Sequence, residues 1–112
     1  MNSLDRKAKI AAYKERKTIA GVYAVICEAT GEAWVGPSRH IDTQRNGLWF
    51  ALRMGGHPSP SLQAAFREHG EASFRFEQLD RLPEDASPLA IGPELKKRAE
   101  LWRARLSASP LP

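Results

Sequence analysis

Residues 19–27, Ile-Ala-Gly-Val-Tyr-Ala-Val-Ile-Cys, decide the fold of this chain. The run is apolar at consecutive positions and rich in β-forming residues, which is typical of a strand covered on both faces. A turn, Glu28-Ala29-Thr30-Gly31, follows it, and a second strand is predicted from residue 32 to residue 36. Two strands joined by a short turn predict a β-hairpin. Pro37 and Ser38 are expected to end it.

Two helices and a third strand are predicted after the hairpin. Apolar residues at i, i+7, i+8 and i+11 from Ile41 predict a helix over residues 41–54, which Gly55-Gly56 should end. The next helix has Ser59 as its N-cap, a proline at its first helical position and a glycine just past its end at residue 70. Residues 73–79 alternate between apolar and polar side chains and predict the third strand.

The two ends of the chain are predicted to add one helix each. Residues 4–17 have apolar side chains at helical spacing after a serine cap. Residues 83–93 form a loop rich in proline and acidic residues, and a helical pattern of apolar residues follows over residues 93–106. Residues 107–112 are expected to be a frayed tail. The predicted order is α-β-β-α-α-β-α in a single α/β (α+β) domain that spans the chain.

The composition fits one globular, cytoplasmic domain. The chain has 112 residues, of which 42% are hydrophobic and 27% are charged. No run of 18 apolar residues occurs, so no membrane span is expected. The charged N-terminus lacks the apolar region of a signal peptide. The single cysteine, Cys27, lies in an apolar run and is expected to be a buried, reduced thiol, which favours the cytoplasm.

The net charge of +4 comes entirely from the first 17 residues. They hold six basic and two acidic side chains, whereas the remaining 95 residues hold 11 of each. A basic helix can contact phosphates and make binding to nucleic acid depend on salt. A charged run on a helix is as often a solvated face, and both interpretations stay open.

An ordered set of motifs connects these elements to a known family. The set begins with Gly21-Val22-Tyr23, and Trp34-Val35-Gly36 starts eleven residues after the tyrosine. It continues with a helix carrying Arg45 and with the sequences Ser61-Leu62-Gln63-Ala64-Ala65, His69-Gly70 and Phe74-Arg75-Phe76-Glu77. In order and spacing, residues 19–80 resemble the GIY-YIG family of metal-dependent nucleases. The resemblance implies a small sheet of three antiparallel strands flanked by helices, with a shallow site on the sheet surface.

The resemblance also implies roles for individual residues. Tyr23 would help to activate the attacking water, Arg45 would stabilise charge on the phosphate, and Glu77 would hold one divalent metal, Mg²⁺ or Mn²⁺. One carboxylate can suffice for such a hard cation, because water and phosphate oxygens supply the other ligands. The expected substrate-binding residues are Trp34, which could stack on a base or pack in the core, Arg39 and Arg53 as further phosphate ligands, and His40 as a proton shuttle.

The expected function is therefore a metal-dependent endonuclease that hydrolyses phosphodiester bonds of nucleic acid, with DNA as the expected polymer. The alternative is an inactive module on the same fold that binds nucleic acid or protein, because Trp34 replaces the family's second tyrosine and no asparagine follows Glu77. The family arginine usually lies ten residues after that tyrosine, where this chain has Gln44. The small size suggests a specificity partner or a homo-oligomer, and a subunit of a larger assembly is the third possibility.

Overall fold

The computed structural model describes residues 18–112, so the predicted helix over residues 4–17 lies outside the described residues. Four strands form one sheet in the order β3-β1-β2-β4. They are β1 (Gly21–Cys27), β2 (Ala33–Ser38), β3 (Phe74–Arg81) and β4 (Ser109–Pro110). Strand β1 is antiparallel to both of its neighbours, and the short β4 runs parallel to β2 at the edge of the sheet.

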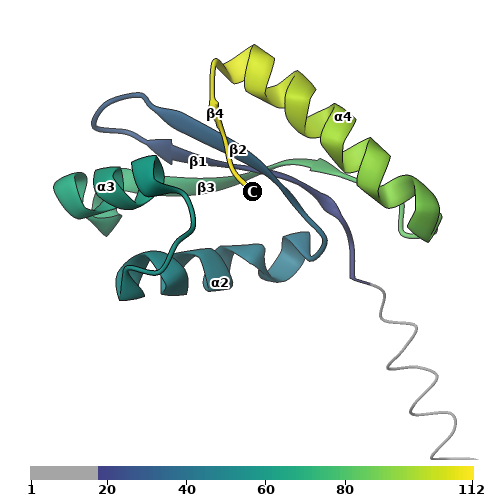
Figure 1. Cartoon of the computed structure of the whole chain (residues 1–112), viewed down its shortest axis with the longest axis horizontal. Helices are drawn as coiled ribbons and strands as arrows, with labels where there is room; N and C mark the ends of the chain where they lie inside the picture. The colour runs from purple at the N-terminus through teal and green to yellow at the C-terminus, as the bar shows by residue number, and fades with distance from the viewer. Residues whose placement is uncertain (1–17) are drawn as a thin grey trace, which may run out of the picture.

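Helices cover both faces of this sheet (Figure 1). Helices α2 (Ile41–Met54) and α3 (Pro60–His69) pack on one face, and α4 (Pro88–Leu106) lies across the other. Successive side chains of β1 point to opposite faces, so Val25 packs in the core under α2 and α3, while Ala24 packs with Ala99 of α4. The apolar run of β1 is thus buried on both sides, as predicted. None of the helices within residues 18–112 is long and apolar enough to cross a membrane.

The predicted boundaries of α2 and α3 are confirmed. Gly55 ends α2 in the left-handed conformation, with φ of 75°, and its amide donates to the Leu52 carbonyl at 3.2 Å. The Ser59 hydroxyl accepts a hydrogen bond from the Leu62 amide at the start of α3, which is the predicted N-cap. The short 3₁₀ helix η1 (Glu71–Ser73) then leads into β3.

Strand β2 is longer than predicted. The sequence suggested that Pro37 and Ser38 end the hairpin, but they pair with Val22 and Gly21 of β1. Strand β4 pairs only with residues 34 and 35, so Pro37 lies where β2 has an open edge. A proline is tolerated at such an edge, because its missing N–H removes no bond of the ladder.

The C-terminal part of the chain corrects two further predictions. Helix α4 starts at Pro88 rather than at residue 93. A proline is tolerated in the first turn, because the N–H that it lacks would have no partner within the helix. The expected frayed tail is wrong: the Leu111 amide donates to the Val35 carbonyl at 2.8 Å, and the Leu111 side chain is only 6% exposed. The α/β class is confirmed, but the sheet has four strands and is mixed, not three-stranded and antiparallel.

Candidate active site

Tyr23 is buried on the face of the sheet that α2 and α3 cover. Its ring stacks on Phe76 of β3, with 5.2 Å between the centroids and 14° between the planes. Its hydroxyl lies against Gly36 of β2, where a Cβ would be only 3.2 Å from the oxygen. Burial disfavours the charged phenolate and raises the pKa of Tyr23 to about 12. The phenol therefore keeps its proton at neutral pH and can act only as a hydrogen-bonding group.

Trp34 belongs to the same core. It is 1% exposed, and its indole N–H donates to the Ser61 hydroxyl of α3 at 3.0 Å. Its ring lies 6.3 Å from the ring of Phe74, measured between centroids. The predicted position for base stacking is therefore enclosed by protein in this structure.

Gln44, not Arg45, faces the end of β2. The Ser38 hydroxyl donates to the Gln44 side-chain oxygen at 2.8 Å, and the His40 amide donates to the Ser38 hydroxyl at 3.0 Å. Arg45 is the next residue along α2, and one helical step of about 100° turns it into solvent. Gln44 stands at the position where the family usually has its arginine, and helix α2 directs it toward β2. The predicted arginine, Arg45, is left exposed.

Glu77 lies on the opposite face of the sheet from Tyr23. It pairs with Ala24 across β1 and β3, and paired residues of antiparallel strands point to the same face, which here is the face of α4. Its carboxylate is 3.4 Å from the Arg75 guanidinium. The structure therefore does not gather Tyr23, Arg45 and Glu77 into one cluster. Their predicted roles stay predictions.

The predicted substrate-binding arginines lie in different places. Arg53, near the end of α2, is bonded to Glu71 in η1, with 3.1 Å between Nη2 and Oε2. Arg39 is exposed just after β2, next to His40 at the start of α2. Arg39, but not Arg53, lines the cleft described next.

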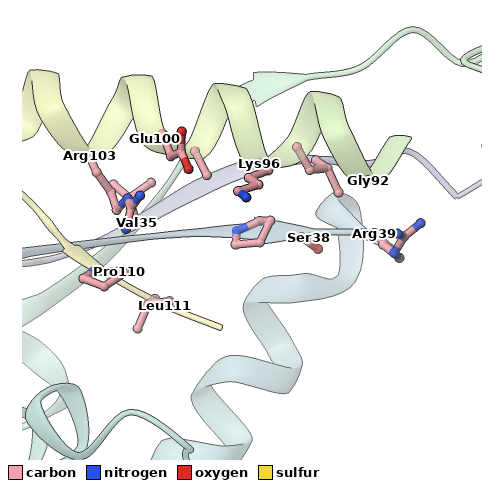
Figure 2. A pocket seen from close by; sticks show the side chains of 12 residues that line it. Val35, Ser38, Arg39, Gly92, Lys96, Glu100, Arg103, Pro110 and Leu111 are labelled. Carbon is pink, nitrogen blue, oxygen red and sulfur yellow. The ribbon is translucent and has the colours of Figure 1, made fainter. Parts of the chain in front are cut away.

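A cleft of about 510 Å³ lies between α4 and the edge of the sheet formed by β2 and β4 (Figure 2). Its apolar lining comes from all three elements and consists of Val35, Pro37, Leu95, Ala99, Pro110 and Leu111. Leu111 also closes the edge of β2, because a Cβ at Gly36 would be 2.7 Å from the Leu111 Cβ. Leu111 lines the cleft and also packs in the core that contains Tyr23, so it connects the cleft to the face of the sheet that α2 and α3 cover.

The charged side chains of the cleft are Arg39, Lys96, Glu100 and Arg103. Three cations and one carboxylate give the cleft a net charge of +2. Within residues 18–112 none of the four takes part in a salt bridge. The Nε atom of Arg103 is buried without a hydrogen-bond partner in the described part of the chain. Positive charge is thus left uncompensated in a concave site.

The sequence reasoning missed Lys96, Glu100 and Arg103, although their spacing carried a signal. Residues 92, 96, 99, 100 and 103 recur at helical intervals and form one stripe along α4. Gly92 opens this stripe, and the Arg39 Nη2 atom lies 3.6 Å from the place where its Cβ would be. The sequence analysis considered only the apolar pattern of this helix, which includes Leu95 and Ala99.

Asp80 of β3 fixes the orientation of α4 over the sheet. Its carboxylate accepts one hydrogen bond from Arg98 at 2.8 Å and another from the Trp102 indole N–H at 3.3 Å. Arg98 is also paired with Glu94 on its own helix, at 3.2 Å. Because both donors to Asp80 belong to α4, these bonds hold the cleft-lining stripe toward β2.

The cleft fits a divalent metal only as a weakly held ion. No group of three or more histidine, cysteine, aspartate or glutamate side chains able to hold a metal occurs among residues 18–112. Among residues 18–112, Glu100 is the single carboxylate that lines the cleft. A Mg²⁺ ion keeps several waters and takes phosphate oxygens as ligands, so one carboxylate can suffice when the substrate supplies the rest.

Comparisons with known proteins identify the fold. No protein-family model matches the chain, and no curated protein matches it either. Among solved structures, the chain has the fold of an endonuclease catalytic domain. The match is to the catalytic domain of the homing endonuclease I-TevI, with a TM-score of 0.67 and 21% identity over 83% of this chain and 98% of that one.

A point mutant of the same intron endonuclease domain gives a TM-score of 0.66 and 22% identity, over 80% of this chain and 86% of that one. The resemblance that the motifs predicted is therefore confirmed at the level of the fold.

Proposed function

We propose that this chain is a nuclease that hydrolyses phosphodiester bonds of nucleic acid at the cleft between α4 and β2. The observation that carries the proposal is a set of three cations and one carboxylate in this cleft, on a fold shared with the catalytic domain of a homing endonuclease. The three cations form no salt bridge with another described residue. The cleft lies at the edge of β2 and is lined by Val35 of the second motif triplet. This position in the motif supports the proposal.

The cations of the cleft suit a phosphodiester. Arg39 and Arg103 each offer a planar, permanently charged guanidinium fork to phosphate oxygens, and Lys96 adds a compact charge between them. Such groups stabilise the extra negative charge that develops on the phosphate during attack. Arg39 therefore takes the phosphate-binding role that the sequence assigned to it, and Arg103 and Lys96 join it.

Glu100 is the residue that would hold Mg²⁺ or Mn²⁺ in this site. When bound, such an ion lowers the pKa of a water ligand and polarises the phosphoryl oxygen. Glu77 was the predicted metal ligand, but it lies on β3, and β1 separates that strand from β2 in the sheet. Tyr23 keeps its proton, so in this proposal it does not remove the proton from water.

An inactive module that binds nucleic acid on the same fold is the second candidate. Two observations favour it. The Trp34 side chain has no hydroxyl and is buried, and the amide of Gln44 stands where the family has an arginine. Such a module would use the same cations to bind the backbone but would not cleave it.

The deciding experiment compares carboxylate variants in a cleavage assay. Supercoiled plasmid and labelled single-stranded DNA and RNA are incubated with Mg²⁺, Mn²⁺ or EDTA and the native chain, Glu100→Gln, Glu77→Gln or Glu32→Gln. Glu32 is an exposed residue next to the hairpin turn and serves as the control. We expect cleavage that needs the metal, falls about 100-fold or more in Glu100→Gln and is unchanged in Glu32→Gln.

The other outcomes separate the alternatives. Loss of cleavage in Glu77→Gln with full activity in Glu100→Gln would return the metal to the residue predicted from the sequence. A folded native chain that binds nucleic acid but cuts no substrate with either metal would contradict the nuclease and leave the binding module.

A further inference from the structure

We propose that the cleft between α4 and β2 receives one unpaired strand of nucleic acid, so that single-stranded DNA or RNA, or an opened stretch of a duplex, is the preferred ligand. The inference rests on the proposed function for the location of the site. It concerns binding, however, and can be tested without cleavage. Four properties of the cleft support it: its size, its apolar lining, the spacing of its cations and an unpaired buried donor.

The size of the cleft excludes a duplex from its interior. A volume of about 510 Å³ is that of a site for one compact small molecule. One or two nucleotides of a single strand fit into such a space. A duplex is much wider, since its major groove alone measures about 12 Å. A duplex could therefore only touch the rim with its outer phosphates.

The lining of the cleft suits unpaired bases. Val35, Pro37, Leu95 and Ala99 present an apolar surface between the charged groups. In a duplex the base faces are stacked inside and the phosphates face outward, so surfaces that bind duplexes are polar and positively charged. Sites for single strands join a positive groove to side chains, commonly aromatic, that base faces can cover. In this cleft aliphatic side chains and prolines would provide that surface.

The cations follow the length of α4, as one strand would. Arg39 lies against Gly92, and Lys96 and Arg103 lie one turn and three turns further along the helix (Figure 2). At a rise of 1.5 Å per residue, the eleven residues from 92 to 103 span about 16 Å. This length covers a few successive phosphates of a single backbone. The arrangement is a linear track along one strand.

Arg103 adds an independent indication that an anion belongs in the cleft. Its Nε atom is buried and has no partner within residues 18–112. A buried donor without an acceptor is unfavourable, and a phosphodiester oxygen is an acceptor of matching charge. Glu100 opposes this attraction when no metal is present, because its carboxylate repels phosphate. Replacing Glu100 with glutamine should therefore tighten binding in EDTA.

The test is a binding measurement in EDTA, where a metal-dependent nuclease cannot cut. Fluorescence anisotropy is recorded with labelled oligonucleotides of about 12 nucleotides. Single-stranded DNA, single-stranded RNA and the DNA duplex of the same sequence are compared at several salt concentrations. The variants are Lys96→Gln and Arg103→Gln in the cleft, with Lys97→Gln as the matched control. Lys97 is an exposed lysine of the same helix and does not line the cleft.

We expect at least one type of single strand to bind about 10-fold or more tightly than the duplex. Each cleft variant should weaken that binding about fivefold and lower the slope of log K against log salt by about 0.7, the value for one phosphate contact on a single strand. Lys97→Gln should change the affinity less than twofold. Circular dichroism of each variant verifies that the fold is retained.

Two results would overturn the inference. One is duplex binding as tight as that of both single strands, and the other is a loss of affinity in Lys97→Gln equal to the loss in Lys96→Gln. Failure of the nuclease proposal looks different: the single strand would still bind preferentially in EDTA, but adding Mg²⁺ or Mn²⁺ would produce no cleavage.

Discussion

Burial decides what the hydroxyl of Tyr23 can do. The phenol is packed against Gly36 and stacked on Phe76. Deprotonation would place a negative charge in this apolar surrounding, so the pKa rises to about 12. Tyr23, which the motif suggests as an activator of water, therefore stays protonated at neutral pH.

This environment predicts how stability depends on pH. The pKa of Tyr23 is about 12 in the folded chain and about 10 in the unfolded chain, so the folded state holds the proton more tightly. The stabilisation is complete below pH 10 and is lost as the pH rises toward 12. The free energy of unfolding of the native chain should therefore fall between pH 10 and 12 by on the order of 2 kcal/mol more than that of Tyr23→Phe.

Urea denaturation at several pH values measures this difference. At neutral pH, Tyr23→Phe should cost less than about 1 kcal/mol, because the substituted ring keeps its stacking on Phe76. If the free energies of unfolding of the native chain and of Tyr23→Phe changed in parallel from pH 10 to 12, the hydroxyl would not be buried in solution.

Single residues also show how far the sequence could predict the candidate site. The order and spacing of the motifs led to the correct hairpin, helices and fold. They could not show that Glu77 and Tyr23 point to opposite faces, because the register of β3 against β1 decides this and the sequence does not contain it. The phase of α2 likewise decides that Gln44, and not Arg45, faces β2.

At the scale of elements, α2 and α3 were predictable because their signals are local, whereas β4 was not. Caps, prolines and glycines at fixed positions mark where the two helices begin and end. Strand β4 consists of Ser109 and Pro110, which are weak strand formers, and it exists because the edge of β2 is open to pairing. The cleft was missed for the same reason, because β4 and Leu111 form one of its walls.

The contact between β2 and the segment after α4 predicts opposite effects for two glycines. A Cβ at Gly36 would be 2.7 Å from the Leu111 Cβ, so Gly36→Ala must displace that segment. Overpacking of this kind should lower the free energy of unfolding by about 1–3 kcal/mol. In contrast, a Cβ at Gly47 in the middle of α2 would meet nothing within 4 Å. Gly47→Ala should therefore stabilise the chain by about 0.5–1 kcal/mol.

Thermal and urea denaturation of the two variants check this prediction, and amide exchange at Leu111 locates the effect. Faster exchange of the Leu111 amide in Gly36→Ala, and not in Gly47→Ala, is expected because that amide bonds to the Val35 carbonyl. A stable Gly36→Ala variant with unchanged exchange would mean that β4 is not held on β2 as described.

At the scale of the whole molecule, charge is divided between two regions. Residues 1–17 carry the entire net charge of +4, and the remaining 95 residues are neutral in sum. Among residues 18–112, several carboxylates form salt bridges with arginines, as Asp42 does with Arg81 and Asp80 with Arg98. The cleft, in contrast, keeps a local charge of +2. A charged segment attracts any nucleic acid over a Debye length, whereas the cleft selects by shape at contact.

This division predicts different effects for substitutions in the two regions. Replacing Arg6, Lys7 and Lys9 together with glutamine should weaken binding to both single strands and duplexes, because basic residues attract the phosphates of either form. The slope of log K against log salt should fall by about 2 for a single strand. The single strand should remain the more tightly bound form, since the cleft sets that preference. Anisotropy with the oligonucleotides used for the cleft variants measures both quantities, and a variant that loses only its single-strand binding would show that residues 1–17 contribute to the choice of strand.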